Sequence, residues 1–170
     1  MIVIIMGVAG SGKTAIGQLL SERLHWPYFE ADDFHSAENR QKMARGEPLD
    51  DQDRLPWLNS LAEVAKKYCN CSENSVISCS ALKNSYREKL TENLSKTQFR
   101  FVFPNVSFEV ARKRLENRKG HFFKPELLRS QFESLEAPSE LEKDNLITVQ
   151  VDSLSVEQIV QIVVDAVLGK

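Results

Sequence analysis

A glycine-rich segment, GVAGSGKT at residues 7–14, follows directly on an apolar run and constrains the fold of this chain more than any other feature. It matches the pattern G-x-x-x-x-G-K-[ST] at every fixed position. Its glycines allow backbone N–H groups to turn inward around phosphate oxygens. A helix expected to start near Gly12 directs the positive end of its dipole to the same place. The segment therefore predicts a binding loop for the phosphates of a nucleoside triphosphate.

Two side chains of this loop have separate expected roles. Lys13 can reach the β- and γ-phosphates as a point charge, and the Thr14 hydroxyl can ligate Mg²⁺. An apolar strand before the loop and an amphipathic helix after it are the context that distinguishes such a loop from a chance glycine-rich turn. The expected nucleotide-binding residues are Gly7, Val8, Ala9, Gly10, Ser11, Gly12, Lys13 and Thr14, with Thr14 as the metal ligand.

Apolar strands alternate with amphipathic helices along the rest of the chain. Strands are expected at residues 2–6, 27–30, 75–79, 99–103 and 147–151, with Pro104 ending the fourth. Helices are expected from Gly12, at 36–45, after Pro56, at 84–94, from Ser107 to about 118, at 126–136 and from Ser155 to Gly169. This order predicts an α/β fold of the P-loop NTPase type, with a five-stranded, mainly parallel sheet and helices on both faces. The 170 residues favour a single domain over residues 1–170.

The composition disfavours several classes of protein. The 22 basic and 24 acidic residues give a net charge of −2, whereas a general nucleic-acid binder would carry a positive excess. The apolar residues 2–6 are too few to span a membrane, and no basic segment precedes them as in a signal peptide. The three cysteines suit a reducing compartment better than a disulfide framework, so we expect a cytoplasmic protein.

An acidic cluster, Glu30, Asp32 and Asp33, follows the second expected strand. The carboxyl ends of parallel strands line the ligand crevice of an open α/β sheet, which brings this cluster beside the phosphate loop. A carboxylate there can accept the proton of an attacking hydroxyl or hold Mg²⁺ through water, although a solvated loop would carry the same residues. The guanine-binding pattern N-K-x-D is absent, which disfavours a signalling GTPase. The length of 170 residues favours a small-molecule or nucleotide kinase.

Four further blocks carry a family resemblance: DDFH at 32–35, NRQKMARGEPLDDQDRLPWL at 39–58, CSALKNSYRE at 79–88 and RKGHFFKPELLRSQFESLEAP at 118–138. Together with the phosphate loop, they resemble the gluconokinase family of shikimate-kinase-like P-loop kinases over nearly the whole chain. The resemblance implies phosphorylation of D-gluconate on its 6-hydroxyl, with ATP and Mg²⁺, to give 6-phosphogluconate. Members are commonly dimers, so it also implies a homodimer, which the sequence itself does not show.

The same resemblance implies the catalytic residues. Asp32 takes the acceptor-hydroxyl position, a role that Asp33 could share, and Lys13 holds the phosphates. Arg118 takes the lid position, where an arginine offsets charge on the transferring phosphoryl group. Related kinases carry Asp where this chain has Glu30, and the longer side chain could still support the Mg²⁺ shell.

A lid is expected over residues 118–126, within a stretch rich in basic side chains. Arg114 is the second lid arginine and is expected to bind ATP. His121 and the pair Phe122-Phe123 would complete the lid, with the aromatic rings helping to exclude water.

D-Gluconate is a flexible polyol with one carboxylate, so its site needs cations and many hydrogen-bonding groups. Lys83 and Arg87 are four residues apart at a helix start and can share a face. The expected substrate-binding residues are Asp32, His35, Arg54, Ser80, Lys83, Arg87 and His121. A surface salt bridge is the alternative role for Arg54 and Arg87, and a core or capping position is the alternative for His35. At the level of function, the alternatives are another small-molecule kinase, such as a shikimate or nucleoside kinase, and a nucleotide sensor without transfer chemistry.

Overall fold

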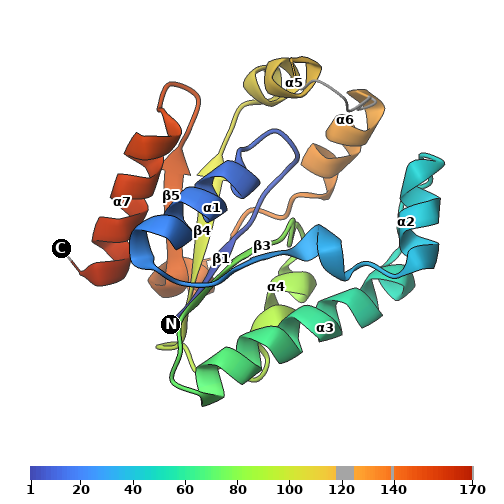
Figure 1. The fold of residues 1–170 in the computed structure, drawn as a ribbon. Helices are drawn as coiled ribbons and strands as arrows, with labels where there is room; N and C mark the ends of the chain where they lie inside the picture. Colours follow the sequence, from blue (N-terminus) through green and yellow to red (C-terminus); the bar gives the residue numbers. More distant parts are fainter. Residues whose placement is uncertain (118–124, 139, 170) are drawn as a thin grey trace.

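The computed structural model describes residues 1–117, 125–138 and 140–169. In these parts, five strands form one parallel sheet in the order β2-β3-β1-β4-β5 (Figure 1). The strands are β1 (Ile2–Ile5), β2 (Tyr28–Glu30), β3 (Ser75–Ser78), β4 (Phe99–Asn105) and β5 (Leu146–Gln150). The helices are α1 (Lys13–Leu24), α2 (Ala37–Ala44), α3 (Asp51–Asn70), α4 (Asn84–Thr91), α5 (Phe108–Glu116), α6 (Pro125–Ser134) and α7 (Val156–Leu168), with 3₁₀ turns η1 (Ala31–Phe34) and η2 (Glu140–Asn145). The predicted α/β fold class is confirmed.

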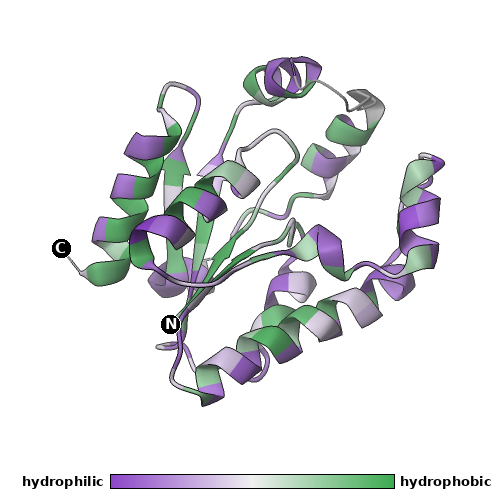
Figure 2. Ribbon diagram, in the orientation of Figure 1, coloured by the Kyte–Doolittle hydropathy of each residue, from purple (hydrophilic) through white to green (hydrophobic). Residues whose placement is uncertain are grey.

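Strand β1 lies at the centre of the sheet and sends alternate side chains to its two faces. Val3 and Ile5 pack into a core with residues of α1 and α7, whereas Ile2 and Ile4 pack with residues of α3 and α4. All four side chains are fully buried. Figure 2 shows the apolar residues along the strands and on helix sides that turn toward the sheet. Helices therefore cover both faces of the sheet. Successive side chains of a strand point to opposite faces, so a strand that is apolar at every position has to be covered on both.

Two element boundaries differ from those predicted at prolines. Helix α3 begins before Pro56 rather than after it, because Asp50 and Asp53 form a reciprocal capping box. This cap satisfies the helix start, and a proline in the second turn removes only one further backbone bond. Strand β4 continues through Pro104, since beyond Val102 it pairs only with β5. A strand segment with one neighbour tolerates the missing N–H of proline.

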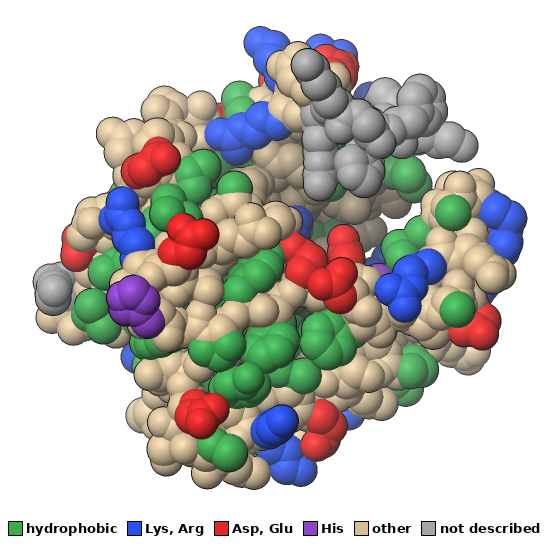
Figure 3. Space-filling view, viewed as in Figure 1, with side chains coloured by type: hydrophobic (Ala, Val, Ile, Leu, Met, Phe, Trp, Pro, Cys, Tyr) green, Lys and Arg blue, Asp and Glu red, His purple; other side chains and the backbone are tan. Residues whose placement is uncertain are grey.

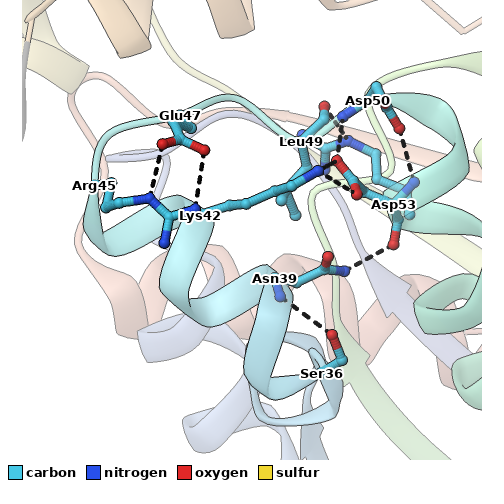
Figure 4. Close-up of polar contacts among 9 residues, drawn as sticks. Ser36, Asn39, Lys42, Arg45, Glu47, Leu49, Asp50 and Asp53 are labelled. Carbon is cyan, nitrogen blue, oxygen red and sulfur yellow. Dashed lines mark hydrogen bonds and ion pairs between the residues drawn. The ribbon is translucent and has the colours of Figure 1, made fainter.

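Helix α2 forms an arm beside α3 that is held by polar contacts (Figure 4). The Nζ atom of Lys42 lies 2.7 Å from Oδ1 of Asp53, and the Asn39 amide donates to the Asp53 carbonyl oxygen at 2.7 Å. The Ser36 hydroxyl caps the helix by accepting from the Asn39 N–H at 3.1 Å. Within α2 the buried residue is Asn39, so polar contacts rather than an apolar face set the position of the arm.

None of the helices in the described ranges combines the length and apolarity needed to cross a membrane.

Gly17 provides a test of how closely α1 packs on the sheet. A Cβ atom at this position would lie 2.5 Å from Cε2 of Tyr28 and 2.7 Å from Oγ of Ser78. Alanine would gain about 1 kcal/mol in helix propensity, but overpacking against two atoms at these distances costs about 2–3 kcal/mol. The Tyr28 ring is held by its hydrogen bond to Glu30 and does not swing away freely. We expect Gly17→Ala to lower the free energy of unfolding by about 1–2 kcal/mol, measured by urea denaturation.

The matched control is Gln18→Ala, at an exposed position of the same helix, where we expect a change within about 0.5 kcal/mol. A Gly17→Ala protein as stable as the parent would contradict this expectation, because it would show that α1 can move away from β2 and β3 at no cost in the free energy of unfolding.

Candidate active site

The glycine-rich loop, residues 7–14, joins the buried strand β1 to helix α1 at the carboxyl edge of the sheet. Gly7, Gly10 and Gly12 have φ angles of 130°, 77° and 96°, in the region that other residues rarely adopt. A Cβ atom on Gly10 would lie 2.6 Å from the Ala111 carbonyl oxygen, so the loop packs directly against α5. The conformation and the adjoining helix N-terminus fit a phosphate-binding loop.

Two basic side chains contact the loop backbone. The Lys13 ammonium donates to the Val8 carbonyl oxygen at 2.9 Å. Arg114, on α5, donates to the Gly10 carbonyl oxygen at 3.4 Å and to the Val151 carbonyl oxygen at 2.8 Å. Arg114 was predicted to bind ATP. Its hydrogen bonds connect the loop to the end of β5, so it lies at the loop in a position that braces the backbone.

Gln131, on α6, is a loop contact that sequence reasoning missed. Its Oε1 atom accepts from the Ala9 N–H at 2.6 Å, although the two residues are 122 positions apart. No local pattern marks a glutamine as a partner of a phosphate loop. The signal that could have found it is its place in the 118–138 sequence block.

The Thr14 hydroxyl, predicted to ligate Mg²⁺, lies beside Glu30. Thr14 donates to Oε2 of Glu30 at 2.8 Å, and the Tyr28 hydroxyl donates to the same oxygen at 2.6 Å. Burial and, secondly, the Glu30 hydrogen bond raise the pKa of Tyr28, which keeps it a hydrogen-bond donor. Glu30, whose side chain is one methylene longer than that of Asp, therefore places its carboxylate in contact with the loop residue Thr14. Residues 1–117, 125–138 and 140–169 contain no cluster of three His, Cys, Asp or Glu side chains that could hold a metal. The Thr14 hydroxyl, hydrogen-bonded to Glu30, could supply one oxygen ligand to Mg²⁺.

The charges of Lys13, Asp32 and Arg54 converge on the end of β3. Burial raises the pKa of the Cys79 thiol to about 12, while Lys13 and Arg54 act to lower it and Asp32 acts to raise it. Asp32 is exposed at the start of η1, directly after β2. The ends of β1 and β2 thus bring a phosphate-loop lysine and a carboxylate into one electrostatic neighbourhood, to which helix α3 adds Arg54.

A cavity of about 610 Å³ opens beside the loop between α3, α4 and α6. Among the predicted substrate residues, Arg54, Ser80 and Lys83 line it. The Ser80 carbonyl oxygen accepts from the Gly7 N–H at 3.0 Å, and Gln131 also lines the cavity. The cavity therefore adjoins the phosphate loop. In Figure 3 this side of the molecule is hollowed next to the α2 arm, with acidic side chains at the edge of the hollow.

The two cations of the cavity differ in their pairing. Nζ of Lys83 lies 2.8 Å from Oδ1 of Asp51, and the Tyr86 hydroxyl donates to the same carboxylate. Hydrogen bonds from Lys83 and, secondly, Tyr86 lower the pKa of Asp51, so this carboxylate stays ionised. Arg54 donates through Nε to the Leu49 carbonyl oxygen at 3.3 Å and has no carboxylate within ion-pair distance in the described part of the chain. Arg54 thus brings to the cavity a guanidinium that is not held in an ion pair, although its charge helps to lower the pKa of Asp51 and of Asp53 nearby.

Arg87 does not join Lys83 in this cavity. Its side chain is 2% exposed and forms a paired contact with Glu142, at 2.6 Å from Nε and 3.2 Å from Nη2. Its Nη1 donates to the Ala81 and Leu82 carbonyl oxygens. Lys83 is the N-cap residue of α4, with extended backbone, so the spacing of four does not place the two side chains on one helical face. Arg87 instead ties α4 to η2.

His35 lies in the core behind the acidic turn. It is 4% exposed and stacks on Trp57, with ring centroids 4.5 Å apart and an interplanar angle of 13°. Burial lowers the pKa of His35. Asp32 opposes this effect, whereas Arg54 and Arg40 add to it, so the imidazole is neutral at neutral pH. This is the core position that the sequence left open as the alternative, and His35 is not among the residues that line the cavity.

Arg118 and His121, together with most of the predicted lid at 118–126, fall on residues 118–124, outside the described part of the chain. Their assigned roles stay predictions.

Comparison with known proteins identifies relatives over nearly the whole chain. Residues 9–167 match the family model for shikimate kinase. The probable gluconokinase of Mus musculus is 42% identical, over 97% of this chain and 96% of its own length. The thermoresistant gluconokinase of Escherichia coli (strain K12) is 43% identical, over 86% of this chain and 82% of its own. The crystal structure of a gluconokinase from Sinorhizobium meliloti 1021 superposes with a TM-score of 0.86 at 37% identity, covering 98% of this chain and 91% of that one. The chain therefore belongs to the shikimate kinase family and, within it, to the gluconokinases.

Proposed function

We propose that this protein transfers the γ-phosphoryl group of ATP to the 6-hydroxyl of D-gluconate, giving 6-phospho-D-gluconate. The observation that carries the proposal is the cavity of about 610 Å³ beside the phosphate loop, in which Arg54 has no carboxylate partner among the described residues. A cation in a polar cavity suits a hydroxylated acid. The relatives named gluconokinase support this choice of acid.

The donor half of the proposed site is the glycine-rich loop. Its amides and Lys13 would hold the triphosphate. Mg²⁺, when bound, would offset negative charge on the phosphates during the transfer. The Thr14 hydroxyl directs its proton to Glu30, which leaves an oxygen lone pair available for the metal. Glu30 would therefore orient the metal ligand rather than replace it.

The acceptor half comprises Asp32 and the cavity. Asp32 would accept the proton of the 6-hydroxyl as its oxygen attacks the γ-phosphorus, while the bond to the ADP oxygen breaks in line. Arg54 would bind the carboxylate of gluconate, since a guanidinium matches a carboxylate in geometry and charge. Ser80, Lys83 and Asp51 offer donors and acceptors for the remaining hydroxyls. His35 and Arg87 would support the fold around the cavity. Arg114 would act on the ATP side, and Arg118 and His121 would act in the lid.

The near alternative is a kinase for another hydroxy acid, such as shikimate, because the chemistry of a carboxylate and hydroxyls is shared. A cytoplasmic location and a homodimer stay predictions that rest on composition and on family resemblance.

The substrate is tested by a coupled assay of ADP release with a panel of acceptors. We expect Mg·ATP turnover to rise strongly with D-gluconate and little with shikimate, glucose or nucleosides. Equal turnover with and without D-gluconate would reject the assignment, and a strong response to shikimate alone would move the protein to the alternative.

Asp32→Asn tests the proton acceptor. We expect kcat to fall by about 10²–10⁴-fold, because general-base assistance contributes that much and an amide cannot accept the proton. The affinity for ATP, measured by calorimetry, should change little, since the phosphate loop is untouched. Asp33→Asn is the matched control and should retain most of the turnover. If Asp33→Asn lost activity while Asp32→Asn kept it, the role would belong to the neighbouring carboxylate.

Arg54→Gln tests the carboxylate contact. A hydrogen bond to a charged group contributes about 1.5–3 kcal/mol, so we expect KM for D-gluconate to rise by about 10–100-fold with KM for ATP nearly unchanged. Arg45→Gln is the control, because Arg45 is an exposed arginine of the α2–α3 connection that pairs with Glu47 and does not line the cavity. An unchanged KM for D-gluconate in Arg54→Gln would place the carboxylate elsewhere.

A further inference from the structure

Helix α6 and the residues that follow it contact both halves of the site. In the helix, Gln131 accepts from the Ala9 N–H of the phosphate loop at 2.6 Å. Just beyond the helix, the Glu136 N–H donates to the Leu82 carbonyl oxygen at 2.9 Å, and its carboxylate accepts from the Asn84 N–H at 2.5 Å. Leu82 also lines the cavity. One segment therefore joins the phosphate loop to the wall of the acceptor cavity.

The Gln131 carboxamide stands at the boundary between the two halves. It lines the acceptor cavity, and its oxygen occupies the Ala9 N–H. An N–H of a phosphate loop is a binding group for phosphate oxygens, and one N–H makes one strong hydrogen bond. A triphosphate oxygen bound at Ala9 would therefore compete with the Gln131 oxygen for this donor.

We infer that Gln131 is a positioning residue that couples nucleotide binding to substrate binding. Without nucleotide, its oxygen holds the Ala9 N–H. With nucleotide, a phosphate oxygen takes that N–H, and the freed carboxamide, which has both donors and an acceptor, turns to a hydroxyl of the polyol in the cavity. The inference rests on the proposed function, because it takes this cavity as the site of D-gluconate.

The expected coupling is positive, because each ligand should tighten the binding of the other. A neutral hydrogen bond makes a modest net contribution, so D-gluconate should bind about 2–10-fold more tightly when nucleotide is present. Linkage requires that D-gluconate tighten nucleotide binding by the same factor. The factor should be near one in a protein that lacks the carboxamide.

Calorimetric titrations measure this factor in the full chain. D-Gluconate is titrated with and without Mg²⁺ and a non-hydrolysable ATP analogue, and the analogue is titrated alone. Gln131→Met keeps the length of the side chain without its hydrogen-bonding groups. We expect this variant to bind the analogue alone as tightly as the parent or up to about tenfold more tightly, because no side-chain oxygen has to be displaced from the Ala9 N–H. We also expect it to lose the coupling.

Gln131→Glu separates this role from a purely structural one. A carboxylate holds the Ala9 N–H more strongly and repels the triphosphate, so the analogue should bind more weakly, opposite to the Met variant. A structural role would weaken binding in both. Ser134→Ala is the control: Ser134 lines the same cavity about one turn further along α6, and none of its hydrogen bonds in the described part reaches the loop, so coupling should persist.

The outcomes distinguish this inference from the function on which it rests. If D-gluconate binds the parent but shows no coupling, or if Gln131→Met couples as the parent does, the role of Gln131 is rejected and the proposed function stands. If D-gluconate binds no form of the protein, the proposed function fails and the inference fails with it.

Discussion

The burial of β1 between β3 and β4 is the constraint on which the rest of the structure depends. Its side chains are fully buried on both faces, so any shift of its backbone would disturb both cores. Backbone hydrogen bonds hold the chain beyond the end of the strand as well. The Met6 N–H donates to the Val102 carbonyl oxygen, and the Gly7 N–H donates to the Ser80 carbonyl oxygen. The phosphate loop therefore begins from a fixed point, and the orientation of its amides is established by folding rather than by the ligand.

The same strand ends organise the charges of the site. Lys13, Arg54 and Asp32 all act electrostatically on the Cys79 thiol at the end of β3, and Asp32 lies in the exposed turn η1. Lys83 is compensated by Asp51, which leaves Arg54 as the cation with no carboxylate partner in the described part of the cavity. Such a pattern provides one position for an anionic group and keeps the remainder of the cavity suited to hydroxyls.

Local patterns in the sequence were sufficient for the elements whose signals are local. The strand–loop–helix unit at the N-terminus and the serine caps of α5 and α7 lie where the sequence predicts them, because each depends on neighbouring residues. The start of α3 was missed because a reciprocal cap outweighs the proline that follows. Arg87 and Gln131 could not be placed, since their partners lie 55 and 122 positions away. Long-range pairing of this kind leaves no periodicity in the chain.

The polar attachment of α2 has a consequence for its dynamics. An arm without a buried apolar face can detach from α3 at a small fraction of the free energy needed to unfold the sheet. Its ion pair, Lys42 with Asp53, is partly exposed and is therefore screened by salt. Hydrogen exchange in the α2 amides should thus be fast and sensitive to ionic strength, while amides of β1 exchange only through global opening. The molecule would thus combine a rigid phosphate-binding loop with an arm that opens locally and that lies outside the residues lining the neighbouring cavity.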